Sequence, residues 1–421
     1  MSAPTTSPPR VNADQASPPR DPDAQAVIDT LIARLTASRH HTLGFPAATD
    51  FDYRPLAPLL AGHLLNNLGD PYVDGAYPSQ TKEQEREVIG VVADLVRAPA
   101  DNRWGYVTSG ATEATEYALH QARELHPTGL VYHSTAAHHS IPATIDRLRM
   151  PAIAIRTEPD GVVDYNDFAG QLGRHRDRPA IMVANIGTAH TEAVDDVARL
   201  VAILDRHGIR RRFVHADAAL AGLPLALIEV TRPDRPRFDM ADGADSIVVS
   251  GHKFIGAPFP CAVLVIKASQ RAHTVRAATY TGSPDTTLTN SRNGLAALVL
   301  WYALRTQGIP GLRKRAEASR TLAAYTHQEL TRLGWPAQRH PHGFTVTLAT
   351  PPGEVLQRWT LAVHGEYSAI VCMPGTTREQ IDAFLTDLRA VMPSRRNGRV
   401  RLPGRRWPKQ RRSPEQETGG R

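Results

Sequence analysis

The sequence is poor in cysteine and has no long apolar run, and both shortages limit what the protein can be. Only Cys261 and Cys372 occur in 421 residues, both in apolar segments, so neither a disulfide framework nor a cysteine metal site is expected. No segment approaches the roughly 18 consecutive apolar residues of a membrane-spanning helix. The proline-rich start lacks the apolar core of a signal peptide. These absences predict a soluble, cytoplasmic protein.

The chain has almost no net charge outside the C-terminal end. The formal net charge is +7, but ten basic residues lie between Arg395 and Arg421, against only Glu415 and Glu417. The remainder is therefore close to neutral, and a body that binds nucleic acid is not expected. We predict a solvated, disordered basic tail, with binding to nucleic acid or another polyanion as the alternative.

Internal repeats are also absent, which excludes solenoids and propellers. Short apolar strands alternate with helical segments such as 112–125 and 194–207, a spacing typical of crossover units in a mostly parallel sheet. The sequence therefore predicts an α/β fold. The candidate strands are 129–132, 152–155, 181–186, 213–215, 246–249 and 262–266.

Beyond Gly294 the pattern changes. A long helical stretch (301–333), two strand-like runs and a final helix (378–391) favour a smaller α+β domain. We expect a disordered tail, an N-terminal arm, a large domain that carries the functional site, a small C-terminal domain and a basic disordered tail. Their predicted bounds are 1–24, 25–76, 77–293, 294–392 and 393–421.

A lysine directly follows one of the candidate strands. Lys253 stands in SGHKFIGAPFPC, after the strand DSIVV. Burying an unpaired ammonium group is costly, so packing alone explains this lysine poorly. A lysine that loses its charge in a pocket is a nucleophilic amine and can form a Schiff base with an aldehyde cofactor. The alternative is a strand-end lysine whose ammonium group reaches solvent.

An aspartate among small residues precedes this lysine in FVHADAAL. A buried, ionised Asp217 needs a cationic partner, and the pyridinium nitrogen of a cofactor ring would serve. The small Ala219 would leave room for the flat face of that ring. The alternative is that Asp217 only caps the following turn.

Two further segments suit a phosphate and an aromatic ring. Ser109, Gly110 and Ala111 form a strand-to-helix turn whose backbone amides can bind phosphate, although such turns also carry these residues as caps. His138 can stack on a ring and assist proton transfer, with a surface or capping role as the alternative. We expect His138 and His139 to point in different directions, and no metal-ligand spacing accompanies them, so no metal site is expected.

Taken in chain order, these motifs resemble the pyridoxal-phosphate-dependent group II amino-acid decarboxylases, most closely the branch of bacterial histidine decarboxylases and plant serine decarboxylases. The resemblance covers residues 43–391. It implies pyridoxal-phosphate fold type I (aspartate aminotransferase-like), pyridoxal 5'-phosphate as cofactor, and a homodimer with a composite active site. The motifs are LGFPAATDFDY, NNLGDP, GYVTSGATEA, HHSIPATIDRLRM, ANIGTAHTEAVDD, HADAAL, SGHKFIGAPFPC, GSPDTTLTNSRNG and MPGTTREQIDAF.

The resemblance also implies residue roles. Lys253 would hold the cofactor covalently, Asp217 would pair with its pyridine nitrogen, and His138 would stack on the ring close to the substrate. Ala219 would lie against the other face of the ring. The segment 282–294 would reach the cofactor of the neighbouring subunit. Further cofactor contacts would come from Ser109, Gly110, Ala111, Asn185, Thr188, Ser250 and His252.

Several positions depart from the family's usual pattern, mainly where the substrate is expected. Ala48 stands where the branch tends to have Asn, and Gly375 where it has His. Glu192 and Asn290 each stand for a Gly, and Ala189 for a Thr; Ala111 also stands for a Gly. The expected substrate contacts are Ala48, His138 and Tyr280.

The expected reaction is decarboxylation of an L-amino acid to its amine and CO2, with the cofactor ring as electron sink. The proton donor to Cα would be Lys253, His138 or Tyr280. Alternatives on the same fold and cofactor are an aliphatic substrate such as valine or leucine, transamination, aldol-type cleavage, or decarboxylation with deamination. An alternative of another class is an inactive binding or scaffold protein with a polyanion-binding tail.

Overall fold

The computed structural model describes residues 22–228, 236–272 and 279–392 and divides the chain into two units, Met1–Thr42 and Leu43–Arg421. The first unit contains α1 (Pro22–Arg39). Within the described ranges, no helix has both the length and the apolar character needed to cross a membrane. The predicted basic tail and most of the predicted N-terminal tail lie outside the described residues.

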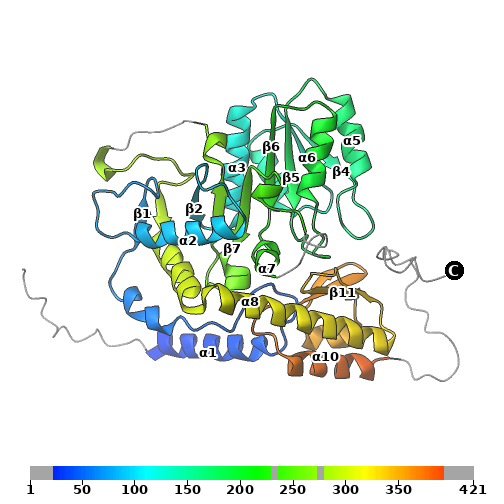
Figure 1. Cartoon of the computed structure of the whole chain (residues 1–421). Coiled ribbons are helices and arrows are strands. Elements are labelled where there is room, and N and C mark those ends of the chain that lie inside the picture. The colour runs from blue at the N-terminus through cyan, green and yellow to red at the C-terminus, as the bar shows by residue number, and fades with distance from the viewer. Residues whose placement is uncertain (1–21, 229–235, 273–278, 393–421) are drawn as a thin grey trace, which may run out of the picture. The chain divides into compact units, whose positions relative to one another are not determined.

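A seven-stranded sheet forms the centre of the second unit (Figure 1). Its order is β2-β8-β7-β6-β5-β3-β4, and β8 alone runs opposite to the other six strands. The predicted α/β fold with a mostly parallel sheet is therefore confirmed. The strands are β2 (Trp104–Thr108), β3 (Leu130–Ser134), β4 (Ala152–Ile155), β5 (Ala180–Asn185), β6 (Arg212–Asp217), β7 (Ser246–Ser250) and β8 (Ala262–Ile266).

Most residues of the central strands are apolar because alternate residues enter two different cores, whereas β4 at the sheet edge is partly exposed. In β6, Phe213 packs with α3 (Ala111–Leu125) and α4 (Ser140–Arg147), whereas Val214 belongs to the larger core on the opposite face. The same alternation places Asp217 on the face of Phe213. The larger core includes residues of α2 (Lys82–Leu95), α5 (Tyr165–Arg174), α6 (Val197–Arg206), α7 (Gly222–Leu227) and α8 (Gly294–Leu333).

A second, antiparallel sheet of order β10-β11-β13-β12 follows the longest helix. That helix, α8, bends at Gly308, whose φ of 59° lies in the left-handed region, two residues before Pro310. It contacts α2 and α7 as well as β11 and α10 (Figure 1). The remaining elements are β1 (Asn66–Leu68), β9 (Ser291–Asn293), β10 (Ala337–Gln338), β11 (Thr345–Ala349), α9 (Gly353–Arg358), β12 (Ala362–His364), β13 (Tyr367–Val371) and α10 (Arg378–Ala390).

The candidate strands predicted from the sequence match six of the seven strands of the large sheet closely; β2 was not among them. The predicted strands 152–155 and 262–266 coincide with β4 and β8, and the other four differ by at most two residues at either end. Their composition made this possible, because strands buried on both faces are continuous apolar runs. The predicted domain boundaries at 76 and 293 stay predictions.

Candidate active site

Parallel strands of the large sheet end at one edge, and predicted site residues lie at or just beyond these ends. Asn185 is the last residue of β5 and Asp217 the last of β6. Ser250 ends β7, and Lys253 follows in a short π-helical turn. His138 lies between β3 and α4. Ligands of open α/β sheets bind outside this edge, so the strand order alone brings these segments to one site.

A pocket of about 340 Å³ lies at this edge. It contains most of the predicted cofactor contacts. Ser109, Gly110 and Ser250 are not among its described lining residues. The predicted residues that line it are Ala111, His138, Asn185, Thr188, Asp217, Ala219, His252 and Lys253.

Lys253 contributes an amino group and Asp217 a carboxyl group to this pocket. Burial lowers the pKa of the Lys253 ammonium group, and the negative charge of Asp217 opposes this shift. The backbone carbonyl of Lys253 accepts a hydrogen bond from the Ala48 amide at 2.8 Å. Asp217 Oδ1 accepts a weak hydrogen bond from the Ala219 amide at 3.2 Å, so this carboxylate caps its turn and also faces the pocket.

His138 lies in the pocket with one ring nitrogen engaged. Its Nδ1 lies 2.8 Å from Ser140 Oγ, which fixes the ring orientation. Burial is the main reason that its pKa is lowered; His139 and Lys253 lower it further and Asp217 opposes them. The expectation that the two histidines point in different directions is wrong, since their ring centroids are 4.0 Å apart at a tilt of 41°.

A buried histidine behind Asp217 was missed by the sequence reasoning. His215, two residues earlier on β6, lies between Thr115 Oγ1 (3.2 Å from Nε2) and Ser246 Oγ (2.8 Å from Nδ1). Burial lowers its pKa to about 4, with Asp217 opposing the shift, so the imidazole is neutral. Thr115 lines the pocket, which connects this chain of hydrogen bonds to the site.

The phosphate end of the pocket has groups suited to an anion. Ser250 Oγ is buried and has no hydrogen-bond partner among the described residues. Ala111 and Thr112, the first residues of α3, line the pocket with their helix N-terminus. The amide and hydroxyl of Ser109 instead both donate to Glu113 Oε2, at 2.8 and 2.6 Å. An orphaned buried hydroxyl, a helix N-terminus, an aspartate and a lysine together fit pyridoxal phosphate.

Other residues of the pocket wall were also missed. Phe45 and Pro46 come from the segment LGFP, and Ala362 and Val371 come from the C-terminal sheet. His190 lines the pocket and stacks on His364, with ring centroids 4.0 Å apart at 22°. Apart from the resemblance of LGFP, no local sequence signal marks these residues.

Two of the three residues expected to contact the substrate, Ala48 and Tyr280, do not line the pocket of their own chain. Ala48 is buried and does not line the pocket; its contact with the site is the hydrogen bond to Lys253. Tyr280 is 74% exposed and is not a lining residue of its own chain's pocket. Gly375, with φ of 97°, approaches Thr49 so closely that a Cβ would lie 2.3 Å from Thr49 Oγ1. The predicted substrate roles stay predictions.

A lysine, an aspartate and a histidine at the carboxyl edge of a mostly parallel sheet, beside a helix N-terminus, define a pyridoxal-phosphate enzyme of fold type I. Residues 20–334 match the model of the pyridoxal-dependent decarboxylase conserved domain. The chain belongs to this family, and it is a pyridoxal-phosphate-dependent amino-acid decarboxylase, a carboxy-lyase.

Curated relatives and solved structures agree with this family. Over 367 residues the chain is 40% identical to a histidine decarboxylase of Mesorhizobium japonicum, covering 87% of this chain and 97% of the relative. Over 347 residues it is 37% identical to serine decarboxylase 3 of Oryza sativa, covering 82% and 77%. The structure of an L-methionine decarboxylase from Streptomyces sp. 590 resembles the fold, with a TM-score of 0.80 at 24% identity, covering 91% and 98%.

Proposed function

We propose that this enzyme decarboxylates an L-amino acid with a neutral side chain, using Lys253, Asp217 and His138. The observation that carries the proposal is the charge of the pocket. Among the described residues that line it, only Lys253 carries an amino group and only Asp217 a carboxyl group, and burial lowers the pKa of its three histidines. Both groups are assigned to the cofactor. Within the described lining residues of this chain, no further cationic group remains for an acidic substrate side chain and no further carboxylate for a basic one.

Each proposed residue has a distinct task. Pyridoxal phosphate, when bound, supplies an electron-accepting ring that withdraws the electrons left by CO2. Asp217 holds a proton on the pyridine nitrogen by its negative charge, and Lys253 Nζ is the covalent attachment point. Ser250 Oγ and the amides of Ala111 and Thr112 hold the phosphate. His138, fixed by Ser140, lies against the ring.

Proton return to Cα needs a group that holds a proton near neutral pH. Lys253 Nζ has a lowered pKa and stands in the pocket, so it can give up a proton that an ordinary lysine would retain. His138, with its pKa also lowered, is a poorer donor. We therefore assign the proton donor to Lys253.

Histidine is the first substrate to test. Its imidazole is neutral above its pKa of about 6.5, and relatives of this chain are histidine decarboxylases. An aliphatic amino acid is the second candidate, because Phe45, Pro46, Leu220, Ala362 and Val371 make much of the wall apolar.

We also propose a homodimer in the cytoplasm. None of the described residues of segment 282–294 lines the pocket of its own chain, which leaves this segment available to the neighbouring subunit's site. Cys261 and Cys372 are both free and buried, as suits a reducing compartment. Analytical ultracentrifugation of the holoenzyme should give twice the chain mass of 46.0 kDa.

The activity test uses the purified holoenzyme and a matched panel of amino acids. Histidine, serine, leucine, valine, glutamate and lysine are each incubated with it, and CO2 and amine are measured. The proposal expects equal amounts of CO2 and amine from a neutral amino acid, with glutamate and lysine poor substrates. Turnover of glutamate or lysine in preference to all neutral amino acids would contradict it, as would an aldehyde or keto acid in place of an amine.

A further inference from the structure

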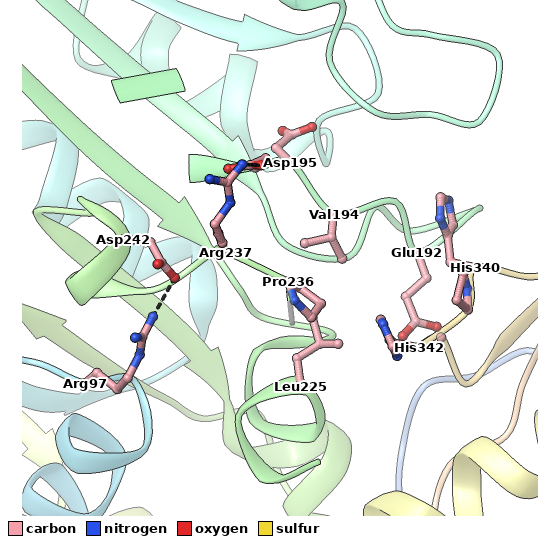
Figure 2. Close-up of a pocket in the computed structure, with 13 residues that line it drawn as sticks. Arg97, Glu192, Val194, Asp195, Leu225, Pro236, Arg237, Asp242, His340 and His342 are labelled. Carbon is pink, nitrogen blue, oxygen red and sulfur yellow. Dashed lines mark hydrogen bonds and ion pairs between the residues drawn. The ribbon is translucent and has the colours of Figure 1, made fainter. Parts of the chain in front are cut away.

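One loop separates two pockets of the second unit. Residues 187–190 line the active-site pocket, and Glu192 lines a larger one of about 640 Å³ (Figure 2). The loop is closed on itself: the Glu192 amide donates to Thr188 O at 2.9 Å, and the Ala193 amide donates to Thr188 Oγ1 at 3.0 Å. A displacement of Glu192 would therefore move the residues that line the active site.

Glu192 is an unfavourable residue for this position. Its φ of 56° lies in the left-handed region, which costs a non-glycine residue about 1 kcal/mol or more. Its side chain is also buried, and desolvation raises the pKa of the carboxyl group to about 7. Both costs require a compensating interaction. That interaction is with the C-terminal sheet, because Glu192 Oε2 accepts hydrogen bonds from the amides of Phe344 (3.0 Å) and Thr345 (2.6 Å), where β11 begins.

The same sheet holds His190 at two further points. Thr347 Oγ1 donates to the His190 carbonyl at 2.7 Å, and His364 of β12 stacks on the His190 ring. The approach of the sheet depends on Gly343, where a Cβ would lie 3.3 Å from Glu192 Oε2. Hydrogen bonds therefore join the loop to β11 at His190 and at Glu192, on either side of Thr191.

We propose that Glu192 is a positioning residue, which fixes the loop 187–193 against β11 and thereby places the His190 ring at the wall of the substrate pocket. The inference rests on the proposed function in one respect, that the substrate side chain binds in this pocket. Glu192 itself faces the other pocket and touches neither cofactor nor substrate. Its loss should therefore weaken substrate binding more than turnover.

Glu192→Gly is the decisive variant, because glycine relieves the positive φ while it removes the carboxylate. We expect KM for the substrate to rise about 10-fold, equivalent to ~1.4 kcal/mol, with kcat within about 2-fold. Arg149→Gly is the matched control. Arg149 also has a positive φ (53°), so glycine relieves the same backbone strain there. Arg149 is exposed, and its substitution removes no hydrogen bond to β11. Its KM should stay at the wild-type value.

A double-mutant cycle tests whether the effect passes through His190. In a His190→Ala background, Glu192→Gly should raise KM by less than about 2-fold, because the ring that it positions is already gone. An unchanged KM in Glu192→Gly alone would overturn the proposal. So would a full 10-fold effect that persists in the His190→Ala background, or a fall in kcat at constant KM.

Amide hydrogen exchange gives a readout that does not depend on catalysis. Peptides covering 187–193 and 343–348 should exchange faster in Glu192→Gly than in Arg149→Gly, whereas peptides of β6 and β7 should not differ. Equal exchange in the two variants overturns the proposal. If no amino acid is turned over, the proposed function fails on its own, and exchange still decides the role of Glu192.

Discussion

The active-site pocket and the larger pocket that Glu192 lines differ in size and in the ion pairs that their residues form. The larger one contains several ion pairs. Arg97 contacts Asp242 at 2.6 Å (Figure 2). Arg97 also contacts Asp239 at 2.6 Å, and Arg237 contacts Asp196. In the smaller pocket, Lys253 and Asp217 form no ion pair within the described parts of the chain. Charges that neutralise each other hold structure together, whereas charges left to face a pocket are available for a ligand. The larger pocket also holds the buried carboxyl groups of Glu192 and Asp195, so ion pairing alone does not separate the two. The smaller pocket is the candidate active site because it lies at the carboxyl ends of the parallel strands beside the N-terminus of α3, although it has about half the volume.

The comparison predicts its largest effect at Asp217. Asp217→Ala removes the carboxylate that keeps the pyridine nitrogen protonated, so turnover should fall by about 1000-fold or more while the cofactor remains attached. Turnover by CO2 release and visible absorbance of the bound cofactor are measured together. Turnover within about 10-fold of the wild type would end the assignment of Asp217 as the partner of the ring nitrogen.

A substitution in the larger pocket should lower the stability of the protein and leave its activity nearly unchanged. Arg97→Ala removes the guanidinium group that contacts both Asp242 and the fully buried Asp239, which should lower the free energy of unfolding by about 3 kcal/mol. Activity per folded molecule should change little. Urea denaturation and steady-state kinetics check both. Loss of activity without loss of stability would mean that the larger pocket takes part in the reaction.

Low pH should lower the free energy of unfolding through His215, which lies behind Asp217 on β6. Its folded pKa of about 4 is below the unfolded value of 6.5, so between these pH values the unfolded chain binds more protons. The stabilisation is complete above pH 6.5 and is lost as pH falls toward 4, by at most about 3 kcal/mol. In His215→Asn this part of the pH dependence should disappear. Identical slopes in the two proteins would show that His215 is not the titrating group.

The smallest predicted effect concerns the orientation of His138. Ser140→Ala removes the hydroxyl that lies 2.8 Å from Nδ1, a hydrogen bond worth about 1 kcal/mol. We expect kcat/KM to fall about 5-fold, with unchanged stability and cofactor content. Ser109→Ala is a useful comparison, because the Ser109 hydroxyl binds Glu113 rather than the pocket. If kcat/KM falls further in Ser109→Ala than in Ser140→Ala, the proposed role of Ser140 in orienting His138 is contradicted.

Much of the fold and the centre of the site could be read from the sequence. Lys253, Asp217 and Asn185 follow or end strands that are apolar on both faces, and the ends of parallel strands meet at one edge. What the sequence could not show depends on contacts between distant segments. Thr115 meets His215 across 100 residues, and Glu192 meets Thr345 across 153. Such side-chain contacts leave no periodic pattern in either segment.

The placement of Ala48 shows the same limit. Its position near the cofactor follows from the family resemblance, but only the structure shows that its backbone amide, rather than its side chain, meets Lys253. Any residue with a backbone amide can make this hydrogen bond, so Ala48 is compatible with the site. The replacement of the branch's usual Asn by Ala48 is therefore weaker evidence about the substrate than the sequence suggested.

The most direct test of this account is to locate the covalently held cofactor. The holoenzyme is reduced with borohydride and digested, and the modified peptide is identified by mass spectrometry, with Lys253→Ala and the exposed-lysine variant Lys314→Ala treated in parallel. We predict a pyridoxyl group on Lys253 in the wild type and in Lys314→Ala, and none in Lys253→Ala. A pyridoxyl group on Lys82 or Lys267, or a label that persists in Lys253→Ala, would contradict the assignment of the smaller pocket as the active site.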